Sequence, residues 1–127
     1  MPGENAPNLH GNKTGIEMID RFLRRADYFQ KYRDNPYMVL RLDLSIARDN
    51  FQIPRAGDLV KVIQASASTV TLDIKFNSDT ANVINLFPYR AVYSYYEKVF
   101  ITNTVQAGAW VDIVFAVTEW FDITDFQ

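Results

Sequence analysis

The sequence contains no cysteine and a single histidine, His10. Disulfide bonds, thiolate metal sites and cysteine nucleophiles are therefore excluded, and a centre with several histidine ligands cannot be built. A Ser-His-Asp triad would depend on His10, which lies in a stretch with almost nothing apolar to bury. We therefore expect no catalytic residues, no bound metal and no cofactor.

The sequence also has few glycines, no long apolar run and only a small net charge. The five glycines are dispersed, so neither a G-x-G-x-x-G motif nor a P-loop can be written. No stretch approaches the roughly 20 apolar residues that span a bilayer, and the N-terminus lacks the charged and apolar regions of a signal peptide. Thirteen Lys and Arg against fifteen Asp and Glu give a net charge of -2, which argues against strong attraction to nucleic acid or anionic membranes. We expect a protein made in a cytoplasm, with neither as a direct partner.

Apolar residues, in contrast, are abundant. They make up 48% of the 127 residues, and aromatic residues make up 14%, which is enough for one folded domain with its own core. Residues 1–14 are the exception, because they hold two Pro, two Gly and three Asn and have no means of burying themselves. This segment is expected to form an extended N-terminal arm.

Residues 15–35 carry the pattern of an amphipathic helix. Apolar residues recur at spacings of three and four with charged residues between them, Thr14 and Glu17 fit a capping box, and Pro36 follows the end. The apolar stripe comprises Ile16, Ile19, Phe22 and Phe29. It must be buried either on the chain's own sheet or on a neighbouring subunit.

After Pro36 the apolar period changes from three or four to two, which predicts strands with one buried face. The predicted strands are residues 38–46, 51–53, 59–64, 70–76, 82–87, 90–95, 98–102 and 109–118, with a last short one at 120–123. Short strands separated by turn residues are typical of a β-sandwich or barrel. We therefore expect a mainly β protein, with an antiparallel β-sandwich or jelly roll over residues 36–127 that follows the arm and the helix.

Five carboxylates are candidates for paired acid-base chemistry: Asp43, Asp73, Glu97, Asp112 and Glu119. Asp43 and Asp73 fall at polar positions of alternating strands, where a solvated carboxylate is ordinary. An enzyme would need two of the five to converge in a cleft with a raised pKa. We favour the solvated interpretation.

Aromatic residues are densest between Phe87 and Tyr96. Tyrosine clusters serve as sugar-stacking platforms or as protein-contact surfaces, and alternate rings can equally face the core. Trp120 and Phe121 are adjacent, so in a strand they would point to opposite faces. The interface candidates are therefore the helix stripe Ile16, Ile19, Phe22 and Phe29 together with Tyr89, Tyr93, Tyr95, Tyr96, Trp120 and Phe121.

Residues 96–123, near the C-terminal end of the sequence, resemble the final strands of small tailed-phage virion proteins of the sandwich or jelly-roll kind. The matching pieces are residues 100–104 (FITNT), 106–108 (QAG), 111–117 and the pair Trp120 and Phe121, and residues 57–74 look like the earlier strands of the same domain. The resemblance covers about residues 50–123 and does not include the arm or the helix.

The resemblance implies a structural virion component without catalysis, such as a capsid decoration or cement protein or a head-tail accessory. It also implies a homo-oligomer, with a trimer favoured, whose partners are the major capsid protein or other virion proteins. The alternative is a carbohydrate-binding β-sandwich module of a virion or cell-surface protein. Such a module needs exposed aromatic rings in a shallow groove beside polar groups, whereas an assembly protein buries them at subunit contacts.

Overall fold

The computed structural model describes residues 19, 20, 22–27 and 29–119. The chain divides into two units, Met1–Lys31 and Tyr32–Gln127. In the first unit, residues 19, 20, 22–27 and 29–31 are helical, as the apolar spacing predicts. Ile16, Trp120, Phe121 and the strand predicted at 120–123 lie outside the described residues.

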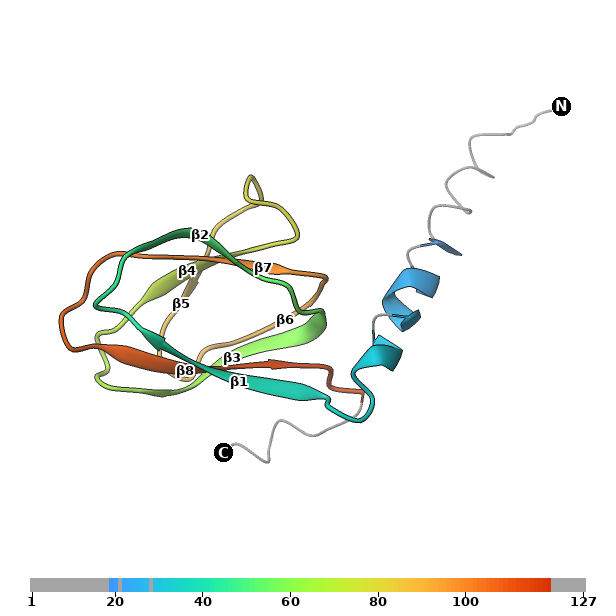
Figure 1. Cartoon of the computed structure of the whole chain (residues 1–127), viewed down its shortest axis with the longest axis horizontal. Helices are drawn as coiled ribbons and strands as arrows, with labels where there is room; N and C mark the ends of the chain where they lie inside the picture. The colour runs from blue at the N-terminus through green and yellow to red at the C-terminus, as the bar shows by residue number, and fades with distance from the viewer. Residues whose placement is uncertain (1–18, 21, 28, 120–127) are drawn as a thin grey trace, which may run out of the picture. The chain divides into compact units, whose positions relative to one another are not determined.

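The second unit consists of two four-stranded antiparallel sheets, which confirms the predicted β-sandwich (Figure 1). One sheet has the order β1-β8-β3-β6 and the other the order β2-β7-β4-β5. In chain order the strands are β1 (Tyr37–Asp43), β2 (Arg48–Ile53), β3 (Gly57–Ala65), β4 (Leu72–Phe76), β5 (Ile84–Leu86), β6 (Ala91–Tyr96), β7 (Val99–Asn103) and β8 (Trp110–Ala116).

The strand pairings are nested. β1 pairs with β8, β2 with β7, β3 with β6 and β4 with β5, and the further pairings of β3 with β8 and of β4 with β7 complete the two sheets. Successive strands therefore alternate between the two layers except at the β4–β5 hairpin.

Alternating apolar residues from both sheets fill the space between them. Along β8, Val111, Ile113 and Phe115 point into this core and are fully buried. Tyr96 joins them: its ring stacks on Phe76 with a centroid separation of 5.0 Å, and its hydroxyl donates a hydrogen bond to the Leu59 carbonyl at 2.7 Å. Burial raises the pKa of this phenol.

The observed strand ends differ from the predicted ones where side chains stabilise turns. The strand predicted at 38–46 ends at Asp43, because the Asp43 carboxylate accepts hydrogen bonds from the Ser45 amide and hydroxyl and closes a turn. β2 begins at Arg48 instead of residue 51, and its register shifts between Arg48 and Phe51, where Asn50 has a φ of 53°. The three residues before the predicted strand at 51–53 thus belong to the same strand, which contains a bulge.

Candidate functional site

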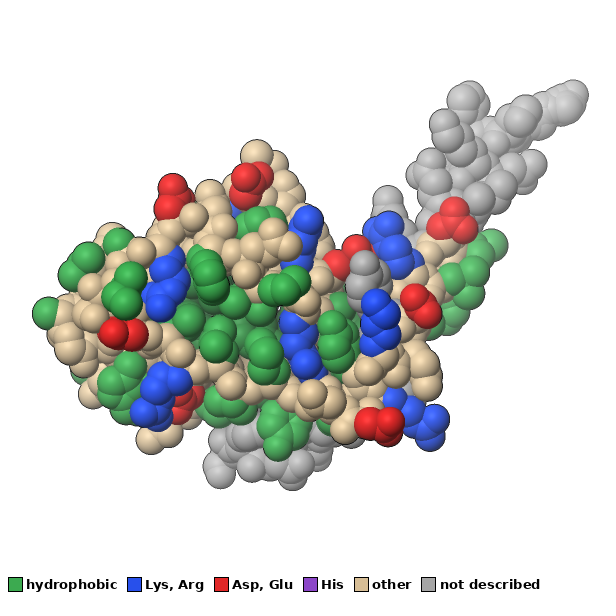
Figure 2. All heavy atoms as spheres, in the orientation of Figure 1, with side chains coloured by type: hydrophobic (Ala, Val, Ile, Leu, Met, Phe, Trp, Pro, Cys, Tyr) green, Lys and Arg blue, Asp and Glu red, His purple; other side chains and the backbone are tan. Residues whose placement is uncertain are grey.

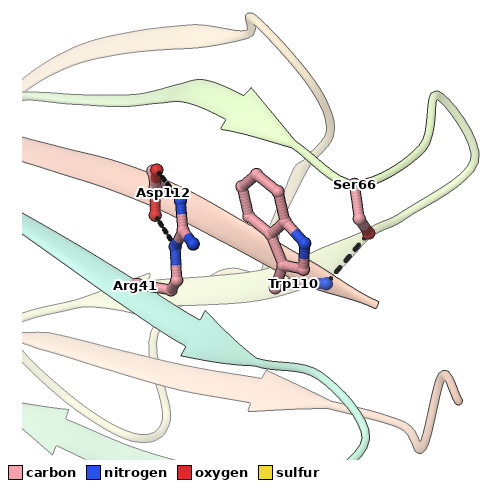
Figure 3. A network of polar contacts seen from close by, with 4 residues as sticks. All are labelled: Arg41, Ser66, Trp110 and Asp112. Carbon is pink, nitrogen blue, oxygen red and sulfur yellow. Dashed lines mark hydrogen bonds and ion pairs between the residues drawn. The ribbon is translucent and has the colours of Figure 1, made fainter. Parts of the chain in front are cut away.

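The outward face of the sheet β1-β8-β3-β6 carries a polar network around Arg41 (Figure 3). Arg41 on β1 lies opposite Asp112 on β8, and its Nε and one terminal nitrogen donate to the two carboxylate oxygens at 2.7 and 2.9 Å. The guanidinium also lies over the Trp110 ring, 3.9 Å from the ring centroid. The Trp110 amide donates to Ser66 Oγ at 3.0 Å, which links β8 to the turn after β3.

The positive charge of Arg41 and the negative charge of Asp112 are paired with each other. The hydrogen bonds from Arg41 lower the pKa of Asp112, and the same contact raises the pKa of Arg41. Asp43 also has a lowered pKa, because Ser45 donates to its carboxylate. An acid-base pair would need a raised carboxylate pKa, so the shifts of Asp43 and Asp112 run in the opposite direction.

A second feature of the sandwich is apolar and lies along its β1–β2 side. β1 and β2 are edge strands of their respective sheets. Figure 2 shows hydrophobic side chains gathered between the two sheets on this side. We call it the β1–β2 flank and define it by Met38, Leu40 and Phe51, which face the space between the sheets, by Ile46 in the β1–β2 connection, and by Tyr37 and Val39 on the outward face of β1.

The flank is apolar because edge strands leave their inward side chains partly uncovered. Met38 and Leu40 pack on the core but are only partly buried. Phe51 lies opposite the buried Ile101, yet it is 50% exposed. Tyr37 and Val39, on the outward face of β1, are 41% and 42% exposed.

A third feature lies where the β3–β4, β5–β6 and β7–β8 connections come together. A hollow of about 320 Å³ is lined by the β3–β4 turn and by Phe87, Pro88 and Tyr89. Tyr89 is 69% exposed and has a φ of 68°, a conformation that costs an L-residue energy. A neighbouring hollow of about 330 Å³ is lined by Ser66, Thr69, Gln106 and adjacent small residues.

The polar groups beside these hollows are already engaged within the chain. The Gln106 side-chain amide donates to the Thr71 carbonyl at 2.8 Å and accepts from the Thr71 amide at 3.2 Å. Ser66 Oγ accepts from Trp110, as described above. A sugar at this end would have to compete for both groups.

The interface candidates predicted from the sequence lie in different parts of the structure and differ in exposure. Ile19 and Phe22 are exposed on the helix, whereas Phe29 is buried. Tyr93 is exposed on β6 and Tyr89 in the turn before it. Tyr95 is half-buried, with its hydroxyl donating to Glu97 at 2.8 Å, and Tyr96 is fully buried in the core, where it cannot serve as a surface contact.

The sequence-based list missed the flank and the Arg41 network. The signal for Tyr37 and Val39 was present, since apolar residues at the polar positions of an alternating strand indicate a second apolar face. No sequence signal pairs Arg41 with Asp112, because 71 residues separate them.

Neither a metal site nor a membrane-spanning helix is found in the described part of the chain. Across residues 19, 20, 22–27 and 29–119, no three His, Cys, Asp or Glu side chains gather in a way that could hold a metal ion. Within the same residues, no helix has the length and apolar character needed to cross a membrane.

No protein-family model matches the sequence, and neither a curated protein nor a solved structure matches it. What the chain does must therefore be inferred from its own residues.

Proposed function

We propose that the chain is a structural, non-catalytic subunit of a phage particle: a capsid decoration or cement protein, or a head-tail accessory. The observation that carries the proposal is the β1–β2 flank. Several large apolar side chains are exposed along these two edge strands, and exposed apolar surface of this kind is typical of subunit contacts.

The nested pairing supports the same proposal. The eight described strands form two four-stranded sheets with β1·β8, β2·β7, β3·β6 and β4·β5 as nested pairs, and from this nesting we infer that the sandwich is a jelly roll. Viral capsid domains and lectins both use this architecture. Fold alone does not choose between these two functions, so the choice depends on the surface.

The helix adds a second apolar surface. Ile19, Phe22 and Leu23, at spacings of three and four, are 59%, 69% and 57% exposed. A helix that presents an apolar stripe needs a partner surface for it. We propose that the helix and the arm before it contact a neighbouring capsid or tail subunit.

The test is incorporation into particles, with a matched pair of substitutions. Ile46 in the flank and Val83 in the β4–β5 connection are both 58% exposed, so Ile46→Ser and Val83→Ser remove similar apolar surface from different places. Ile46→Ser is expected to lower the copy number of the chain in purified particles, measured by quantitative mass spectrometry, and Val83→Ser is expected to leave it unchanged. Absence of the wild-type chain from purified particles would refute the proposal.

The second candidate, a carbohydrate-binding module, is favoured by Tyr89 alone. Its exposed ring beside a hollow is suited to stacking on a sugar, but Gln106 and Ser66 already have partners within the chain. Glycan binding that is lost in Tyr89→Ala and retained in Tyr93→Ala would favour this module over the assembly role.

A further inference from the structure

The outward face of the sheet β1-β8-β3-β6 carries an apolar cluster of its own. The register of β3 with β8 places Leu59 beside Ala116. Val60, the next residue of β3, belongs to the core between the sheets, so Leu59 and Ala116 face away from the second sheet. We call this group the outer cluster and define it by its buried residues Leu59, Val114 and Ala116, against which Ile63 and Ala91 pack.

The middle of this face is buried, whereas its two sides are not. All three residues of the outer cluster are 0% exposed. Tyr37, opposite Ala116 on β1, and Tyr93, opposite Leu59 on β6, are exposed. The outward face of an antiparallel sheet is solvated unless another layer lies on it. The structure contains a single chain, so the layer that covers the outer cluster belongs to the chain itself.

The last described residues of the chain lie beside the outer cluster. Val117 follows Ala116 directly and is fully buried. Thr118 donates from its amide and its hydroxyl to the two carboxylate oxygens of Asp58, both at 2.9 Å. Asp58 precedes Leu59 in β3, so these bonds hold the chain next to the cluster shortly before residues 120–127 begin.

Residues 120–127 have the composition and the length of a covering segment. Four of the eight residues are large and apolar, namely Trp120, Phe121, Ile123 and Phe126. Eight extended residues span up to about 26 Å, and four strands spaced about 4.8 Å apart are about 14 Å across. The segment is therefore long enough to cross the face from the anchor at Thr118.

We propose that residues 120–127 lie across the outward face of the sheet β1-β8-β3-β6 and cover the outer cluster, as a third layer of the sandwich. The apolar stripe of the helix is a less suitable cover, because Ile19 and Phe22 remain exposed. A neighbouring subunit is not needed, because the cluster is already buried within one chain. The inference goes beyond the proposed function: it assigns Trp120 and Phe121, two of the predicted interface candidates, to the chain's own fold.

The first test compares two isoleucines in the full chain. Ile123 lies in the middle of the proposed cover and Ile19 is 59% exposed on the helix, so Ile123→Ser and Ile19→Ser make the same change in different places. Ile123→Ser is expected to raise the unfolding equilibrium constant of the sandwich roughly 30-fold, because a buried isoleucine loses its contacts with the cluster. Ile19→Ser is expected to leave the constant unchanged. Both constants are measured by urea denaturation followed by circular dichroism.

The second test locates the segment. Trp110→Phe leaves Trp120 as the one tryptophan, and the absence of cysteine allows a nitroxide label to be attached at a single engineered position. Trp120 is expected to emit at shorter wavelength, and to be quenched less by acrylamide, in the folded chain than in urea. A nitroxide on Tyr93→Cys, opposite Leu59, is expected to quench Trp120 more strongly than one on Val83→Cys in the β4–β5 connection of the other sheet.

Three results would overturn the proposal: Ile123→Ser with the wild-type unfolding constant, Trp120 quenched by acrylamide as strongly as in urea, or equal quenching by the two nitroxides. Protection of Trp120 that disappears on dilution also overturns it, because the segment would then cover a second copy of the chain. Each test decides the result if a variant in the other does not fold. None of these measurements depends on incorporation into particles, so this proposal and the proposed function fail separately.

Discussion

Gly57, the first residue of β3, lies where the chain has no room for a side chain. A Cβ added there would meet the Tyr96 hydroxyl at 2.5 Å, the Ala116 carbonyl oxygen at 2.6 Å and Tyr96 Cζ at 2.8 Å. Neither neighbour can move freely, because Tyr96 is stacked on Phe76 and bonded to Leu59, and Ala116 belongs to the central strand β8. We predict that Gly57→Ala destabilises the sandwich.

The cost follows from overpacking a filled core, which is typically about 1–3 kcal/mol and is highest where the surroundings cannot relax. We expect a loss of about 3 kcal/mol in the free energy of unfolding, measured by urea denaturation. Gly108→Ala is the control, because a Cβ there meets nothing within 4 Å. Gly108 has a φ of 72°, so this control should lose only about 1–2 kcal/mol through backbone strain.

Tyr96→Phe extends the test to a double-mutant cycle. Removing the hydroxyl costs about 1 kcal/mol for the lost hydrogen bond to Leu59, but in the double variant it also removes the closest clash with the methyl group added at Gly57. The two single losses should therefore sum to more than the loss of the double variant. Rescue should be partial, because the contact with the Ala116 carbonyl remains. Stability of Gly57→Ala within about 0.5 kcal/mol of wild type, the range of ordinary surface substitutions, would refute the packing argument.

Two further predictions concern the surface. The pKa of Asp112 is lowered in the folded chain, so its pairing with Arg41 stabilises the fold above the unfolded carboxylate pKa of about 4, and this stabilisation is lost as the pH falls from there through the folded pKa. Asp112→Asn should therefore be less stable than wild type at pH 7, and the difference should shrink on acidification. A difference in stability that does not change with pH would contradict the pairing. Tyr89 has a positive φ, so Tyr89→Gly should be more stable than Tyr89→Ala by about 1 kcal/mol in thermal denaturation, and equal stabilities would mean that no strain is relieved.

Much of the fold follows from local pattern. The alternation of Leu72, Ile74 and Phe76 predicts β4 nearly as observed, because one face of that strand is buried and the other is not. Pattern fails where a side chain determines the backbone: Asp43 ends β1 through Ser45, and Asn50 inserts a bulge into β2. The spacing of apolar residues along the sequence indicates neither the turn nor the bulge.

The candidate surfaces were less accessible to sequence reasoning. Tyr93 and Tyr96 belong to the same aromatic run, yet one is 63% exposed and the other is fully buried. Alternation places residues three apart on opposite faces of a strand, but which of the two tyrosines faces the core depends on how β6 pairs with β3. The flank likewise depends on β1 and β2 being edge strands, and strand order is decided by contacts between distant residues.

The nested pairing also has a consequence for how fast and in what order the sandwich forms. Among the described strands, β4 and β5 are the one pair that is consecutive in the chain and hydrogen-bonded, with Asp73 and Asn85 twelve residues apart, whereas Arg41 and Asp112 are 71 residues apart. Loop-closure entropy favours short-range pairs first, so assembly should proceed from this hairpin outward and bring β1 to β8 last. Folding is then slow, on the order of milliseconds to seconds. Until that last step, the edge of β8 that later pairs with β1 stays exposed in a newly synthesised chain.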